Sequence, residues 1–397
     1  EADGFAPRTD SDVVRGYDNL SANIHGTRRY GAGEIGLRHW QTQGTQEYLD
    51  FFLSPVDQDF KNRTSALQID NPVADNGSSK LVVSVMQDEI TQNQVDDFVR
   101  SDRISIDWQY SHALGEHTLA GGLFAIDETA SSLSFGAGFK EDTTVRAAFV
   151  QDQWARGRHR SFVALRYTDH ETFGDQVTWN TEYAFEINAS WSFTAGIGHA
   201  FRAPDATDRY GFGGRPDLEP ELADEAQLGL RFAPGNGHRV DLELYGNDIE
   251  NLIEFDLETF QLDNIAATEI RGAQLGYEYR GERFVFRAEA VKQRADNAVT
   301  GERLLRRAEE TATVSYTQDV GAHRFGISLF ASGKREDFGG IELPGYVLAN
   351  LTAQLNLADT WALHLRVDNL LDTEYETAAG FRMQERGSFV ELKYRWN

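Results

Sequence analysis

The stretch Ser388–Trp396 (SFVELKYRW), near the end of the chain, decides the fold because its side chains alternate in character with a period of two. Successive residues of a β-strand point to opposite faces, so every second residue lies on the same side. One side then carries the apolar set Val390, Leu392, Tyr394 and Trp396. The other side carries Phe389, Glu391, Lys393 and Arg395. The stretch therefore predicts a strand with one apolar face and one mostly charged face.

The same alternation recurs through residues 283–397, with almost no helical pattern between the runs. Phe325 and Ile327, for example, oppose Gly326 and Ser328. A soluble sheet alternates in this way when one face covers a core and the other meets water. A closed membrane barrel also alternates, with its apolar face to lipid and its polar face to the lumen. Both solutions stay open, but the many charges on the polar faces favour a barrel with a wet interior.

The composition suits a large barrel and excludes several other classes of protein. The chain has 397 residues, no cysteine and a formal net charge of −25. This length is too great for one ordinary sandwich and suits a single barrel domain over 1–397. No run of 18 consecutive apolar residues occurs, so no transmembrane helix is expected. The acidic balance argues against a nucleic-acid partner, and the lack of cysteine excludes disulfides and thiolate metal sites.

Nineteen strands are predicted, and this odd number is informative. Their approximate ranges are 15–28, 31–44, 59–70, 79–91, 98–113, 117–128, 143–156, 159–170, 174–187, 190–202, 221–233, 238–254, 260–279, 283–294, 303–318, 322–334, 346–358, 361–371 and 383–396. Short turns alternate with longer loops, expected at 46–58, 129–142, 203–219, 295–301 and 334–344. An antiparallel bacterial barrel closes with an even number of strands, and an unpaired edge in lipid is costly. Either the count is wrong or strands are missing.

Several motifs give the chain a resemblance to a known family. They are Phe201–Pro204 (FRAP), Arg209–Gly211 (RYG), Pro216–Glu221 (PDLEPE), Asn247–Ile249 (NDI), Leu252-Ile253, Ile270–Gly272 (IRG), Leu304–Ala308 (LLRRA) and Val367–Glu376 (VDNLLDTEYE). In combination they resemble the motifs of TonB-dependent outer-membrane receptors, and the LLRRA run is most similar to the cobalamin-receptor branch. A weaker similarity extends back to Thr9, so the resemblance covers nearly the whole chain.

The resemblance implies an all-β fold, a large antiparallel transmembrane β-barrel that has 22 strands around a plug in this family. Against that pattern the chain begins at the fourth strand, which gives about 19 strands. The N-terminal plug, the TonB box and the first three strands have no counterpart in it. The implied location is the bacterial cell outer membrane, where the barrel would contact lipid as a monomer.

The resemblance also implies a receptor that takes up a scarce, bulky nutrient, cobalamin in the nearest branch, by binding and passage and not by enzymatic chemistry. Contact with the TonB complex would run through the plug. Two alternatives stay open: a receptor for a siderophore or another ligand, and a plugless barrel for passive diffusion. An outer-membrane hydrolase is a third, but Asp169-His170 has no Gly-x-Ser-x-Gly elbow beside it and is interpreted as a surface turn.

Two arginines stand out as candidates for a site. Arg306 matches a ligand-contacting position in the cobalamin branch, and its planar guanidinium suits directional hydrogen bonds. The alternative for Arg306 is a lumenal charge paired with Glu309 or Glu310. Arg202 and Glu221 flank a long loop, and a pair between them would tie that loop to the wall.

Four aspartates are candidates for a calcium site in the loops, and no catalytic cofactor is expected. The resemblance places extracellular calcium ligands at Asp10, Asp12, Asp50 and Asp59. Calcium takes six to eight oxygen ligands, largely carboxylates, from flexible loops. The alternative is that these acidic loops are simply solvated. Ala6 stands where the family has a further aspartate, which would weaken the site.

Overall fold

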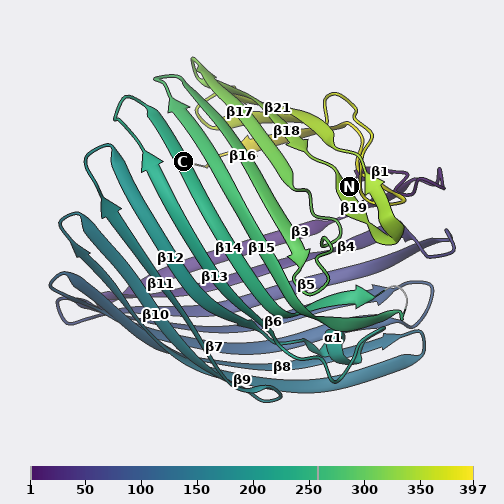
Figure 1. The fold of residues 1–397 in the computed structure, drawn as a ribbon, viewed down its shortest axis with the longest axis horizontal. Coiled ribbons are helices and arrows are strands. Elements are labelled where there is room, and N and C mark those ends of the chain that lie inside the picture. Colours follow the sequence, from purple (N-terminus) through teal and green to yellow (C-terminus); the bar gives the residue numbers. More distant parts are fainter. Residues whose placement is uncertain (1, 257–258, 397) are drawn as a thin grey trace.

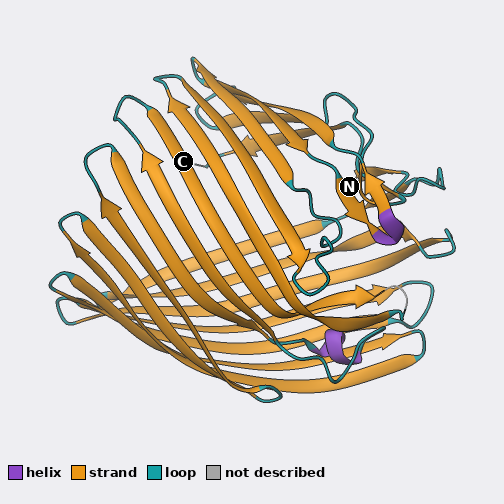
Figure 2. Cartoon of the chain, in the orientation of Figure 1, coloured by secondary structure: helices purple, strands orange, loops and turns teal. Residues whose placement is uncertain are grey.

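The computed structural model describes residues 2–256 and 259–396, and these fold almost entirely into β-strands (Figures 1 and 2). The first half contains β1 (Ala2–Phe5), β2 (Arg15–Tyr17), β3 (Leu20–Tyr30), β4 (Gly33–Leu49), β5 (Pro55–Val73), β6 (Gly77–Gln92), β7 (Phe98–Leu114), β8 (His117–Ser134), β9 (Ala137–Arg156), β10 (His159–His170), β11 (Gly174–Glu186) and β12 (Trp191–Arg202). The second half contains α1 (Ala206–Tyr210), β13 (Glu221–Phe232), β14 (His238–Asp256), β15 (Gln261–Arg280), β16 (Phe284–Asn297), β17 (Glu310–Val320), β18 (His323–Ser332), β19 (Arg335–Asp337), the 3-10 turn η1 (Phe338–Gly340), β20 (Ile341–Leu343), β21 (Tyr346–Asn356), β22 (Trp361–Asp368), β23 (Glu376–Ala378), β24 (Phe381–Arg382) and β25 (Gly387–Tyr394).

The long strands follow one another as antiparallel neighbours in sequence order. The sixteen strands from β3 to β18 pair in succession, and β21, β22 and β25 continue the series to nineteen. With the short β1 and β2 the sheet has 21 strands, and it curves round to form a barrel wall (Figure 1). The predicted fold class and the predicted nineteen strands are confirmed.

The strand register places apolar side chains from neighbouring strands in one row. Leu228 pairs with Leu244, and Leu230 pairs with Leu242, which in turn pairs with Leu275 on the next strand. Many large apolar side chains in these rows are exposed, whereas only eight apolar residues in the described part of the chain are buried. A soluble sandwich would bury these rows in a dry core, so a barrel that turns them to hydrocarbon and its charges to a wet lumen accounts for the pattern.

Aromatic side chains gather where the strands meet the short turns. Trp191 packs against Phe232 with ring centroids 4.6 Å apart, and Trp361 packs against Tyr394 at 4.7 Å. Trp and Tyr favour the boundary between hydrocarbon and water, because their rings are apolar and their N–H or O–H groups are polar. The short-turn ends of the strands therefore mark one boundary of the membrane. In the described residues, no helix is both long enough and apolar enough to cross a membrane.

Two of the nineteen long strands, β3 and β25, have a partner on one side only. β3 pairs with β4, and β25 pairs with β22. All residues of β3 are exposed, as are all residues of β25 after the first. Because β3 is the first and β25 the nineteenth strand of one antiparallel series, the two run in the same direction. We call the gap between the unpaired edges of β3 and β25 the seam. It follows from the odd number of strands.

The N-terminal segment, residues 2–18, crosses the loop end of this seam. On one side, Thr9 N donates a hydrogen bond to Gly380 O at 3.1 Å, and Arg382 N donates to Pro7 O at 2.9 Å. On the other side, Asp18 N donates to Thr45 O of β4 at 3.0 Å. The segment thus joins the β23–β24 hairpin to β4, across the gap between β25 and β3.

Several predicted boundaries were wrong. The strand expected at 15–28 is divided into β2 and β3, the loop expected at 334–344 contains β19 and β20, and the strand expected from 383 begins at Gly387. The loops expected at 46–58 and 129–142 are mostly strand: β4 and β5 are joined by 50–54, and β8 and β9 by the two residues 135–136. Polar residues there continue the pairing across the strands, as in the bond from Thr129 Oγ1 to Asp142 Oδ1 at 2.6 Å. The strand expected from 303 begins only at Glu310, because Arg306 adopts a φ of 62°, which a strand does not allow. The polarity of the sequence alone is therefore not enough to place the ends of these strands.

Charge placed on the apolar face should destabilise the barrel, whereas charge on the polar face should not. Leu329 lies in the apolar row between Val314 and Ala349, and Ser328 points to the opposite face. Leu329→Arg is expected to lower the free energy of unfolding by about 2–4 kcal/mol, the cost of arginine near the middle of a bilayer. Ser328→Arg should cost far less. Urea unfolding in lipid vesicles measures both, and an equal loss in the two variants would contradict the assigned faces.

Candidate functional site

Arg306, the predicted ligand contact, lies in the loop between β16 and β17 and is held in place by β19. Its Nε donates to Asp337 Oδ1 at 2.8 Å, and its guanidinium lies over the Phe338 ring at 5.0 Å from the centroid. Its backbone N–H donates to Glu336 O at 2.7 Å. The side chain is nevertheless 45% exposed. Arg306 is therefore fixed in orientation with part of its guanidinium in solvent, and its contact with a ligand stays a prediction.

Asp337, which sequence reasoning missed, is the most buried charged side chain of the loops, at 1% exposed. Besides Arg306, it accepts hydrogen bonds from Phe338 N at 2.7 Å and from Ala379 N at 2.5 Å. Burial by itself would raise the pKa of Asp337, but the bonds from Ala379, Arg306 and Phe338 outweigh it and lower that pKa. One carboxylate thus joins three loops, 298–309, 333–345 and 369–386. Its sequence signal is an aspartate just before a Phe-Gly-Gly turn whose N–H it can cap.

The other charged residues beside Arg306 have partners of their own. Arg303 pairs with Glu309 at 2.5 Å, and Lys292 pairs with Glu310 at 2.9 Å. The alternative pairing of Arg306 with Glu309 or Glu310 is therefore wrong, because Asp337 takes that place. The first of these ion pairs lies within the 298–309 loop, and the second joins β16 to β17.

Two of the predicted calcium ligands, Asp10 and Asp12, lie beside the β23–β24 hairpin. Asp10 accepts a hydrogen bond from Arg8 Nε at 3.3 Å, and Asp12 lies 3.8 Å from Arg382 Nη1. Both carboxylates therefore face guanidinium groups. These contacts offset the negative charge of the two carboxylates, which would otherwise attract a cation.

The other two predicted ligands, Asp50 and Asp59, lie near the loop end of β4 and β5. Asp50 Oδ1 accepts hydrogen bonds from Phe52 N at 2.9 Å and Ser54 N at 2.7 Å, so it caps the turn. Asp59 accepts a bond from Thr45 Oγ1 at 2.6 Å. Within the described ranges, no three acidic or histidine side chains come together closely enough to hold a metal ion. Calcium stays a prediction that would require these loops to rearrange.

The predicted tie between Arg202 and Glu221 is present. Arg202 Nη1 lies 2.9 Å from Glu221 Oε1, and Arg202 Nη2 lies 3.0 Å from Asp208 of α1. Asp205 and Asp208 form a capping box at the start of α1, where each side chain accepts a backbone N–H of the other residue. Burial, followed by the nearby charge of Asp205, raises the pKa of Asp208. The loop between β12 and β13 is thereby anchored to the strand wall.

A polar hollow of about 380 Å³ lies under α1, between it and β6–β10. Arg103 donates to both oxygens of Glu128, at 2.8 and 2.9 Å. Arg209 is stacked near two rings, 5.4 Å from the centroid of Phe173 and 4.7 Å from that of Tyr210. The hollow combines aromatic surface with charged hydrogen-bonding groups, which suits part of a polar ligand.

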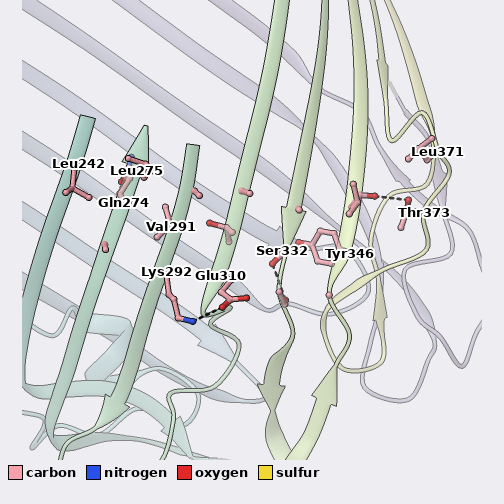
Figure 3. A pocket seen from close by; sticks show the side chains of 18 of the residues that line it. Leu242, Gln274, Leu275, Val291, Lys292, Glu310, Ser332, Tyr346, Leu371 and Thr373 are labelled. Carbon is pink, nitrogen blue, oxygen red and sulfur yellow. Dashed lines mark hydrogen bonds and ion pairs between the residues drawn. The ribbon is translucent and has the colours of Figure 1, made fainter. Parts of the chain in front are cut away.

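A larger hollow of about 980 Å³ lies on the apolar face (Figure 3). It follows the apolar row from Leu242 and Leu275 to Ala290 and on across β17 and β18. The ion pair between Lys292 and Glu310 stands at its edge (Figure 3). Since this row is the one that meets hydrocarbon, the hollow is a furrow in the lipid-facing surface and no lumenal ligand site.

Removing the charge of Asp337 should loosen the three loops that it joins. Asp337→Asn keeps the shape but weakens the bonds from Arg306 and two backbone N–H groups, a loss of about 1–3 kcal/mol in local stability. Trypsin should then cut faster after Arg306 and Arg307. Because the pKa of Asp337 is lowered in the fold, its stabilisation is complete above the ordinary aspartate pKa and is lost as the pH falls through the lowered value. Cleavage of the wild type by an acid protease should accelerate in that range, below about pH 4.

The control is Asp75→Asn, an exposed aspartate in the short turn between β5 and β6. It should leave cleavage of the 298–309 loop unchanged. Equal cleavage rates in Asp337→Asn and the wild type would show that Asp337 does not hold the loops.

Comparison with known proteins agrees with this geometry. Residues 2–370 match the family model described as TonB dependent receptor-like, beta-barrel. The vitamin B12 transporter BtuB of Vibrio cholerae is 28% identical over 292 residues, which cover 70% of this chain and 46% of that protein. BtuB of Vibrio vulnificus is 26% identical over 428 aligned positions, covering 100% of this chain and 68% of that protein. The chain thus spans about half the length of the Vibrio cholerae transporter.

Solved structures share the fold at low sequence identity. A mutant of the ferric enterobactin receptor PfeA of Pseudomonas aeruginosa has a TM-score of 0.81 and 14% identity, covering 98% of this chain and 72% of that one. The iron transporter FrpB of Neisseria meningitidis has a TM-score of 0.80 and 12% identity, covering 95% and 72%. With the family model matching more than nine-tenths of the residues, the chain belongs to the TonB-dependent receptor-like β-barrel family of the outer membrane.

Proposed function

We propose that this chain forms the barrel wall of a TonB-dependent receptor that takes up cobalamin across the outer membrane. The observation that carries the proposal is the similarity to vitamin B12 transporters along 70–100% of the chain. The fold alone does not select the ligand, because the similar solved structures include receptors for iron compounds and a copper transporter. The sequence similarity therefore supports cobalamin among ligands that the fold treats alike.

The geometry supports a role in binding and passage. Charged side chains line the lumenal face. The Arg202 ion pair ties one loop to the wall, and the Arg306 ion pair ties two loops to each other. A ligand held between such loops meets oriented donors whose positions are already fixed, so binding costs less conformational entropy. Energy for release would come from the TonB complex, acting through a plug.

A siderophore receptor is the second candidate, because the fold that this chain shares with the ferric enterobactin receptor is equally compatible with it. A passive diffusion barrel is the third, favoured by the charged and wet lumen. Ion conductance in planar bilayers separates it from a receptor, because a lumen filled by a plug conducts almost nothing. A steady, large conductance from the full-length protein would favour passive diffusion.

Titration with cyanocobalamin tests the proposal and the calcium prediction together. The wild-type protein in detergent should bind cyanocobalamin saturably, and calcium should tighten binding by about tenfold, equivalent to ~1.4 kcal/mol. Asp50→Asn should abolish the calcium effect, because it removes one carboxylate of the predicted site. Asp75→Asn, in a turn at the other end of the strands, should leave the effect intact.

Two results would count against this function. No binding of cyanocobalamin with or without calcium, combined with saturable binding of a ferric siderophore, would transfer the proposal to the second candidate. A calcium effect that survives Asp50→Asn would remove that residue from the predicted site.

A further inference from the structure

Four phenylalanines from three loop-end segments lie next to one another at the loop end of the barrel. We call this group, Phe135, Phe212, Phe255 and Phe260, the mouth cluster. The Phe135 and Phe212 ring centroids are 5.3 Å apart, and those of Phe255 and Phe260 are 6.4 Å apart. Gly213 connects the two pairs, because a Cβ built on it would lie 2.7 Å from the Phe255 ring. Gly213, which follows Phe212 in the chain, thus brings the second ring pair close to the first.

The backbone holds these rings in place at some cost. Phe135 has a φ of 50°, unusual for a bulky residue, and its N–H donates to Asp97 Oδ2 at 3.0 Å. Gly213, at a φ of 69°, accepts a hydrogen bond from Leu262 N at 2.7 Å. The tip of the β8–β9 hairpin, the β12–β13 loop and the start of β15 are therefore brought together with defined geometry.

The mouth cluster lies beyond the lipid-facing rows, where the surroundings are water, and its rings are nevertheless exposed. Phe135 is 81% exposed and Phe212 is 63% exposed. An exposed apolar patch outside the membrane is unfavourable in water and commonly marks a binding surface. On the same loops, the ring centroids of Phe139 and Tyr210 lie 6.1 Å apart, and both residues line the hollow under α1. The hollow therefore has aromatic surface of its own, on segments that also carry Phe135 and Phe212.

The charges beside the cluster restrict what it can bind. Asp97, in the β6–β7 loop, accepts the Phe135 N–H, and Asp217 and Asp263 lie on the segments of the cluster. Arg215 is already paired with Asp217 at 2.6 Å and with Asp263 at 2.7 Å. The surroundings are thus acidic and would repel an anion. We propose that the mouth cluster binds the flat, apolar face of a ring system that carries no net negative charge. This deepens the proposed function, on which it rests, by naming the class of ligand.

Three water-soluble probes test the charge and ring requirements: cyanocobalamin, which is neutral; proflavine, a flat aromatic cation; and pyrenetetrasulfonate, a flat aromatic anion. Fluorescence anisotropy reports the two dyes, and equilibrium dialysis reports cyanocobalamin, with empty micelles as the reference. The wild type should bind proflavine at least tenfold more tightly than pyrenetetrasulfonate. The double variant Phe135→Ala, Phe212→Ala should weaken proflavine binding at least tenfold.

The matched control is Phe52→Ala. Phe52 is 83% exposed in the turn between β4 and β5, where it contacts Phe51 and lies on a loop other than those of the mouth cluster. It should leave proflavine binding unchanged. A comparable loss in Phe52→Ala would mean that any exposed ring binds the dye and would overturn the inference.

The dyes separate this inference from the proposed function. If cyanocobalamin fails to bind while proflavine binds through Phe135 and Phe212, the cobalamin proposal fails and the mouth cluster remains a ring-binding site. If proflavine does not bind, or if pyrenetetrasulfonate binds as tightly, the inference is overturned whatever cyanocobalamin does.

Discussion

Hydrocarbon supplies no water to replace a missing backbone partner, so complete strand pairing is the constraint on which this structure depends. Once nineteen strands are paired in succession, every second side chain must face lipid, and rows such as Leu230, Leu242 and Leu275 follow. The loops lie outside hydrocarbon and do not share this constraint. They are held by single charged groups, of which Asp337 and Arg202 are the clearest, because a chain with so little buried apolar surface has no core against which to pack them.

The wall was predictable from sequence because lipid enforces a strict period of two. Leu329 and Ser328 could be assigned to opposite faces without coordinates, and the strand number followed from counting such runs. Boundaries at the loop end were less predictable. Beyond the membrane both faces meet water, so Thr129 and Asp142 stay paired in strands although their polarity indicates a loop. There, hydrogen bonding alone decides where a strand ends.

The candidate site was only partly predictable, because its contacts join segments that are far apart in sequence. Arg202 and Glu221 stand at the two ends of one loop, and their pairing could be anticipated from that position. Arg306 could be identified by resemblance, but its partner Asp337 lies 31 residues away on another loop. The mouth cluster gave no signal at all, since isolated phenylalanines are common in strands and only the folded loops place four of them together.

The N-terminal segment closes the ring of chain at the loop end of the barrel. Although β3 and β25 are not paired with each other, the bonds from Thr9 to Gly380 and from Asp18 to Thr45 connect the two sides of the seam. A closed ring of fixed circumference resists both widening and narrowing. A few backbone bonds in one short segment therefore hold the two edges of the wall together at this entrance, and the edges can separate there only if these bonds break.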